Sequence, residues 1–285
     1  MNLGKLGVWY SIDKMPPATI GAFVNHVEKL GYSTLWYPEA RGHEAFTVGG
    51  YMLGASKTLQ FGSSIANMYA RDAVSARQAM RGLNTLYGGN RFVLGLGVSH
   101  RPMVEGVRGH TYGKPVPEMR AYLDAMERGT TDSADWPLAL AALGPLMLKL
   151  AAARTRGALP YNVTPAHTAE AKAILGPDKW LAVEQKFCLE TDPVRARALG
   201  RAELSRYMAL ENYRNNWLRI GFTEAELANG GSDRFIDAMV LWGDVATVRR
   251  GIDAHFTAGA THVCIQPVHA EGDFAARDAM LAAMA

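Results

Sequence analysis

The chain has 285 residues, 48% of them hydrophobic, and its 30 basic and 27 acidic residues leave a formal net charge of +3. This composition supplies a large core, and the length suits one large α/β domain or two ordinary ones. No lysine- or arginine-rich block suggests nucleic-acid binding, and no apolar run reaches the roughly 20 residues of a membrane-spanning helix.

Short β-rich apolar runs alternate with amphipathic stretches along the chain. In the first such stretch, apolar residues at helical spacing end at Gly31, a typical stop signal. We predict strands over Leu6–Tyr10, Thr34–Pro38, Leu59–Ile65, Arg91–Val98, Leu138–Leu143, Ala158–Asn162, Trp180–Leu189 and Thr261–Gln266. We predict helices over Pro17–Leu30, Ala73–Tyr87, Pro117–Arg128, Leu146–Thr155, Pro165–Leu175, Pro193–Ala228 and Val245–Ala258.

This alternation predicts parallel strands, since parallel neighbours need long crossovers. A doubly wound open sheet would show the same alternation, but the length and the eight strands favour a closed (β/α)8 TIM barrel over residues 1–285. About 70 residues separate the last two strands, and we interpret about 191–245 as a helical insertion, or lid, over the barrel mouth. Its aromatic residues are candidate pocket walls or core residues: Tyr207, Tyr213, Trp217 and Phe222.

In such a barrel, the chemistry belongs at the carboxyl ends of the strands. The second strand is followed by Glu39, Arg41 and His43. Either Glu39 or His43 is a candidate proton donor there, and an ordinary solvated loop is the alternative reading. The third strand runs into a polar segment in which Asp72 would cap the next helix.

The fourth strand carries glycine at alternate positions, Gly95 and Gly97, before it ends in Ser99 and His100. Glycine at these positions either relieves packing inside the barrel or lets a flat ligand approach. The pattern is not a dinucleotide fingerprint, because the third glycine and the acidic ribose partner are missing. His100, at the strand end, is a candidate functional histidine.

The fifth strand ends in Gly144 and Pro145, directly before a predicted helix. Free N–H groups at the start of that helix would hold an anion, although a plain tight junction is an equal alternative. No Ser-His-Asp triad, glycosidase carboxylate pair or metal cluster can be identified. Cys188 and Cys264 lack zinc-ligand spacing and read as reduced core thiols, so we expect no metal.

Five segments, in order and spread over nearly the whole chain, resemble the luciferase-like oxidoreductase superfamily. More narrowly, they are similar to its actinobacterial branch that uses deazaflavin coenzyme F420. The joint match is far more specific than any one motif. The segments are Leu35–Glu39, Ser64–Asp72, Arg91–His100, Ala142–Pro145 and Glu211–Asn216.

The resemblance implies how a flavin-type ring would be held. It implies a non-prolyl cis peptide bond between Ser64 and Ile65, with Ile65 against one face of the ring. Asn67 would hydrogen-bond the pyrimidine edge of the ring, and Ser99 and His100 would line the cofactor.

The resemblance also implies a place for the cofactor's phosphate. Gly144 and Pro145 would lie under the ribityl chain, and the backbone N–H groups after Pro145 would bind the phosphate. Either Arg71 or Arg101 would assist, and the sequence does not choose between them.

The implied activity is hydride transfer between F420 and a small organic substrate, with Glu39, His43 or His100 handling the accompanying proton. A two-component FMN monooxygenase is the first alternative, and a non-catalytic flavin- or deazaflavin-binding protein is the second. An aldolase-type barrel is less favoured, because Lys179 and Lys186 do not suit a Schiff-base position. We expect a cytoplasmic homodimer that dimerises as its relatives do, without a membrane or nucleic-acid partner.

Overall fold

The computed structural model describes all 285 residues and contains a closed barrel of eight parallel strands. The barrel closes because β1 pairs with β2 on one side and with β10 on the other, and β10 pairs in turn with β8. The predicted (β/α)8 architecture and its eight strands are therefore confirmed. The barrel strands are β1 (Leu6–Trp9), β2 (Thr34–Tyr37), β3 (Gln60–Ser63), β5 (Phe92–Gly97), β6 (Leu138–Leu140), β7 (Gly157–Ala158), β8 (Trp180–Cys188) and β10 (His262–Pro267).

Two further short strands were not predicted. β4 (Ala66–Asn67) follows β3 and pairs with β5, with Ala66 opposite Leu96. β9 (Val240–Trp242) pairs with the end of β8, with Leu241 opposite Phe187. Both strands are too short to leave a periodic signal in the sequence.

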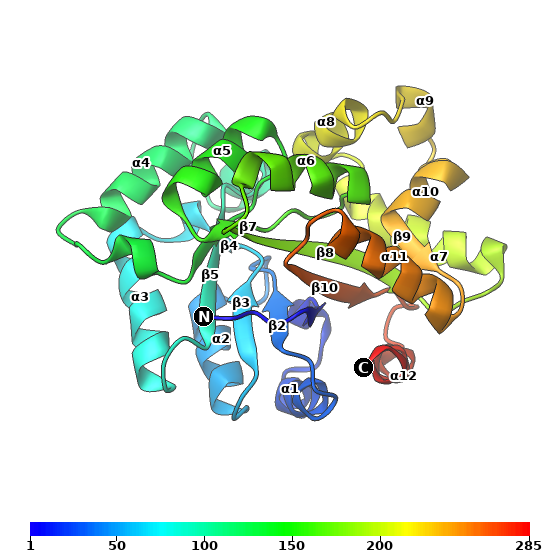
Figure 1. Ribbon diagram of the computed structural model, residues 1–285, viewed down its shortest axis with the longest axis horizontal. Coiled ribbons are helices and arrows are strands. Elements are labelled where there is room, and N and C mark those ends of the chain that lie inside the picture. Colours follow the sequence, from blue (N-terminus) through cyan, green and yellow to red (C-terminus); the bar gives the residue numbers. More distant parts are fainter.

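Helices surround the strands, with α8, α9 and α10 gathered together at one side of the molecule (Figure 1). Most of the predicted helices are confirmed to within a few residues, whereas α2 and α12 were not predicted. The helices are α1 (Ile20–Lys29), α2 (Ala45–Gly54), α3 (Ala73–Leu86), α4 (Pro115–Glu127), α5 (Pro145–Arg154), α6 (Pro165–Leu175), α7 (Pro193–Leu204), α8 (Glu211–Arg219), α9 (Glu224–Leu227), α10 (Asp233–Met239), α11 (Val245–Thr257) and α12 (Phe274–Met284).

The long helical stretch predicted over Pro193–Ala228 is helical but not continuous. The chain forms α7, a short 3₁₀ turn at Ser205–Tyr207, and then α8 and α9. Leu210 has extended backbone angles directly before α8, and Gly221 has a φ of +101°, which a continuous helix excludes. These interruptions turn the segment across the barrel mouth.

Side chains inside the barrel form a separate core, distinct from the larger one between strands and helices. Trp36 fills much of it, and glycine is required opposite, because a Cβ on Gly62 would lie 2.2 Å from the Trp36 ring. Cys188 and Cys264 are both buried, and neither forms a disulfide. No helix in the structure combines the length and the apolar character needed to cross a membrane.

Candidate functional site

A cavity of about 800 Å³ opens where the carboxyl ends of the barrel strands meet. Loops that are far apart in the sequence converge on it, as barrel geometry predicts. The segment from the end of α7 to the end of α8 also contributes to its walls. The cavity is lined by Trp9, Pro38–Arg41, Ser64–Ile65, Gly97–His100, Tyr112, Ala141–Met147, Leu159, Tyr161, Arg206, Tyr207, Leu210, Asn212, Tyr213, Asn215, Asn216 and Arg219, among others.

One wall of the cavity is an apolar shelf formed by Ile65. The peptide bond between Ser64 and Ile65 is cis, as the resemblance implied. A Cβ on Gly97 would lie 2.6 Å from Cγ1 of Ile65, and a Cβ on Gly95 would lie 1.9 Å from the carbonyl oxygen of Ser63. The two glycines of β5 therefore make room for neighbouring protein atoms, which favours packing relief over direct contact with a ligand.

The start of α5 forms a second, polar wall. Gly144 precedes the helix without a side-chain cap, and Pro145 is its first residue. The first N–H groups of a helix lack partners within it, so those of Leu146 and Met147 are free to meet an anion at the cavity. A Cβ on Gly144 would meet no atom within 4 Å, so this wall is open.

Two side chains of α8 lie beside this helix start. Arg219 Nη2 is 3.4 Å from the carbonyl oxygen of Leu143 and 2.9 Å from Oδ1 of Asn216, while its Nη1 contacts Glu170. Asn216 is 4% exposed, and its Nδ2 has no hydrogen-bond partner in the protein. An unpartnered buried donor that lines the cavity is able to donate a hydrogen bond to a group bound there.

Glu39 lines the cavity, but other groups hold its carboxylate. Arg71 forms an ion pair with it, and the backbone N–H of Asn67 donates to its Oε2 over 2.7 Å. Arg71 also contacts Glu44 at 2.8 Å and lies over the ring of Phe46. Arg71 and Asn67 do not line the cavity. This cluster ties the loop after β2 to the segment after β3.

The two candidate histidines lie in different surroundings. His43 does not line the cavity, whereas His100 does, beside Ser99. The His100 ring is 5.6 Å from that of Tyr213. Burial lowers the pKa of His100 below its ordinary 6.5, and a hydrogen bond with Asn212 opposes that shift. His100 is therefore largely neutral near pH 7 and able to accept a proton.

Several lining residues were not singled out from the sequence. Trp9 ends the first barrel strand and Tyr161 lies just after the sixth, where barrel geometry marks them as candidates. Asn216 and Arg219 belong to α8, which lies in the segment predicted to cover the mouth, but which of its side chains would face the cavity had no local signal. Of the four aromatic residues suggested as pocket walls, Tyr207 and Tyr213 line the cavity, whereas Trp217 and Phe222 are buried away from it.

Comparison with known proteins yields a family and several similar folds. The family model described as luciferase-like monooxygenase matches residues 3–262. A protein of Mycobacterium tuberculosis, provisionally named a coenzyme F420-dependent oxidoreductase, is 30% identical over 200 residues. That match covers 58% of this chain and only 56% of the relative, little more than half its length.

Solved structures share the fold at low sequence identity. An F420-dependent secondary alcohol dehydrogenase in complex with an F420-acetone adduct has a TM-score of 0.76 and 16% identity over 100% of both chains. The coenzyme F420-dependent tetrahydromethanopterin reductase of Methanopyrus kandleri has a TM-score of 0.73 and 16% identity, covering 99% of this chain and 98% of its own. The oxygenating constituent of 3,6-diketocamphane monooxygenase of Pseudomonas putida, in complex with FMN, has a TM-score of 0.70 and 15% identity, covering 100% of this chain and 97% of its own.

Proposed function

The chain belongs to the luciferase-like monooxygenase family, and from this premise we propose that it is an oxidoreductase that transfers a hydride between coenzyme F420 and a small organic substrate. The observation that carries the proposal is the cavity of about 800 Å³, which combines an apolar shelf at Ile65 with an uncapped helix start at Gly144. Such a site suits a flat ring that carries a phosphate. The M. tuberculosis relative and two of the structures named above support F420 as the cofactor.

The residues present fit such a cofactor. Ile65 with Ser64 would support one ring face, and Ser99 and His100 would line the ring. Gly144 and Pro145 would lie along the chain that joins the ring to the phosphate, for which the uncapped start of α5 is suited. When bound, deazaflavin supplies the hydride acceptor or donor, and the protein supplies orientation and a dry, shaped site.

We assign the arginine beside the phosphate to Arg219. Arg71 is held between two carboxylates and does not line the cavity. Arg101 is paired with Glu105 at 2.7 Å and likewise does not line it. Arg219 is also paired, with Glu170 at 2.7 Å, but it lines the cavity beside the start of α5 together with the unpartnered amide of Asn216, so it is the better placed of the three.

Among the candidate proton-handling residues, the geometry favours His100. It lines the cavity, and burial keeps it largely neutral at pH 7, so it can accept a proton when a substrate is oxidised and return it when a product is reduced. Glu39 is held by Arg71 and the backbone, which suits a positioning role, and His43 lies outside the lining.

Side-by-side fluorescence titration of the purified protein with F420 and FMN tests the proposal. We expect saturable quenching of F420 at micromolar concentration, with weaker binding of FMN. Preferential binding of FMN would instead support a two-component monooxygenase, which the fold of the FMN-bound structure also allows. Tight F420 binding without turnover of any supplied alcohol or ketone would indicate a non-catalytic carrier. No binding of either cofactor would contradict the proposal.

We also propose a single domain in which α7–α10 cover the cavity as a lid, supported by the residues from Arg206 to Arg219 in its walls. Exposed apolar side chains on α2 and α3, Tyr51, Val74 and Leu86, support a homodimer formed through those helices. A cytoplasmic location agrees with the two unbonded cysteines. Light scattering and proteolysis with and without F420 test the dimer and the lid.

A further inference from the structure

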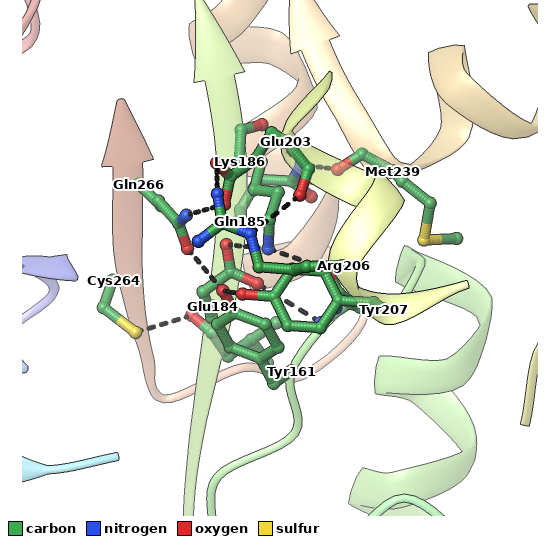
Figure 2. A network of polar contacts seen from close by, with 12 residues as sticks. Tyr161, Glu184, Gln185, Lys186, Glu203, Arg206, Tyr207, Met239, Cys264 and Gln266 are labelled. Carbon is green, nitrogen blue, oxygen red and sulfur yellow. Dashed lines mark hydrogen bonds and ion pairs between the residues drawn. The ribbon is translucent and has the colours of Figure 1, made fainter. Parts of the chain in front are cut away.

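Two tyrosine hydroxyls meet at a part of the cavity wall that the cofactor assignment above does not use. Tyr161 follows β7 and Tyr207 ends the turn after α7, and both line the cavity. Their hydroxyl oxygens are 2.7 Å apart, and the two rings lie side by side in Figure 2. The hydroxyls come from segments 46 residues apart, so only the fold brings them together.

The direction of the hydrogen bonds behind this pair is fixed by a buried carboxylate. Glu203 accepts from Nε2 of Gln266 over 2.9 Å and from Arg206 over 2.5 Å. That contact orients the Gln266 amide so that its Oε1 accepts the hydroxyl proton of Tyr161 over 2.8 Å. Tyr161 has only one proton to donate, so Tyr207 must be the donor in the contact between the two hydroxyls.

This arrangement leaves an adaptable hydrogen-bonding group at the cavity. The Tyr207 oxygen retains lone pairs that can accept from a ligand hydroxyl. Its proton can also rotate away from Tyr161 and donate to a ligand carbonyl, because Tyr161 keeps its own bond to Gln266. The pair therefore suits either an alcohol or a ketone.

The charges behind the pair are already matched. Nζ of Lys186 lies 3.8 Å from the centroid of the Tyr161 ring and contacts Oε1 of Glu184 at 3.1 Å, with both side chains almost fully buried. Glu203 is paired with Arg206, whose side chain is 42% exposed, and with Lys14 at 3.5 Å (Figure 2 shows the Arg206 contact). The two hydroxyls themselves offer no ion of opposite sign to a charged ligand group, so its desolvation would be compensated less well than that of a neutral group.

We propose that Tyr161 and Tyr207 form the subsite that recognises an uncharged hydroxyl or carbonyl group of the substrate. The surrounding wall is apolar and aromatic: Trp9 lies 5.0 Å from Tyr161, and Tyr213 lies 5.3 Å from Tyr207, between ring centroids. The substrate class is then a neutral, largely apolar alcohol or ketone. The inference rests on the proposed function in that it takes this cavity to be the substrate's.

Binding of small probes to the cofactor-free protein tests this subsite by saturation-transfer NMR. Cyclohexanol and cyclohexanone are compared with methylcyclohexane, which lacks oxygen, and with cyclohexanecarboxylate, which is charged. We expect both oxygenated neutral probes to bind more tightly than the other two. Tyr207→Phe should weaken cyclohexanol binding about 3- to 10-fold, as expected for one hydrogen bond, and bring it close to that of methylcyclohexane.

Tyr32→Phe is the matched control, because Tyr32 also donates one buried hydrogen bond, to the carbonyl oxygen of Leu281, and does not line the cavity. It should leave all four affinities unchanged. Tyr161→Phe keeps the Tyr207 hydroxyl and should weaken cyclohexanol less than Tyr207→Phe does. Thermal melting verifies that each variant is folded.

Two results would overturn the subsite: a native protein that does not prefer cyclohexanol to methylcyclohexane, or an unchanged preference in both cavity variants. An F420 titration of the same proteins separates this result from the proposed function. The Tyr207→Phe variant should lose the preference for cyclohexanol over methylcyclohexane while its F420 binding stays intact. Failure of the native protein to bind F420 would count against the proposed function alone.

Discussion

Replacing Lys186 with methionine leaves Glu184 unpaired where its side chain is only 2% exposed. Burial raises the pKa of Glu184 and Lys186 opposes that rise, so removing the lysine raises this pKa further. Breaking a buried ion pair by removing one partner costs about 3–5 kcal/mol. Lys186→Met should lower the free energy of unfolding by about that amount at pH 7, and by less as the pH falls toward the ordinary carboxyl pKa of 4.5.

Glu184→Gln should show the opposite pH dependence. Burial lowers the pKa of Lys186 and Glu184 opposes that shift, so removing Glu184 lowers this pKa further. Breaking the pair should cost about 3–5 kcal/mol at pH 7, and less as the pH rises toward the ordinary amine pKa of 10.5. The double variant carries neither charge and should lose only about 1 kcal/mol, for the hydrogen bond from Lys186 to Asn162.

Urea unfolding at about pH 5, 7 and 9, each variant compared with the native protein at the same pH, measures these differences. Glu105→Gln is the control, because the ion pair between Glu105 and Arg101 is exposed on both sides and should give no such pH dependence. Equal losses for both single variants at all three pH values would refute the reasoning. So would a double variant less stable than either single variant.

Three further results follow from the structure. Gly144→Val should fold normally, since a Cβ there meets no atom within 4 Å. It should weaken F420 binding about tenfold or more, because the larger side chain fills part of the cavity. Unchanged F420 affinity in a fluorescence titration would contradict the cofactor assignment. Gly97→Ala should lower the free energy of unfolding by about 1–3 kcal/mol, because the new Cβ would lie 2.6 Å from Ile65. An unchanged free energy of unfolding in urea would contradict the packing role of this glycine. Burial lowers the pKa of His262 to about 4, so its stabilising contribution is fully present above pH 6.5 and is lost as the pH falls through 4. The melting temperature of His262→Gln should therefore fall less steeply over that range than the melting temperature of the native protein. Equal slopes for the two proteins would count against this origin.

The barrel itself was accessible from the sequence because each of its strands is a short apolar run at a regular place in the alternation. Helix α2 was not, because Gly49 and Gly50 interrupt its helical signal. The structure gives the reason for one of them: a Cβ on Gly49 would lie 2.4 Å from the Tyr37 hydroxyl. Local propensity and tertiary packing disagree at this helix, and packing decides.

The site was accessible only in part, for a similar reason. Strand ends mark Ile65, His100 and Gly144 as lining candidates, because barrel geometry converts a position along a strand into a position at the mouth. The ion pair between Arg71 and Glu39 is not marked in this way, although Glu39 itself is a strand-end candidate. The guanidinium of Arg71 meets Glu39 only because two loops approach each other. In the sequence Arg71 is a candidate phosphate ligand, whereas in the structure it links the two loops.

The pairing of β1 with β10 bears on how the protein is made. Leu6 is synthesised 257 residues before its partner Val263. One edge of β1 therefore stays unpaired while the residues between them are made, and the ring of strands stays open until β10 has been added. A small molecule that needs the finished barrel mouth can bind and stabilise the protein only after β10 has paired with β1 and β8.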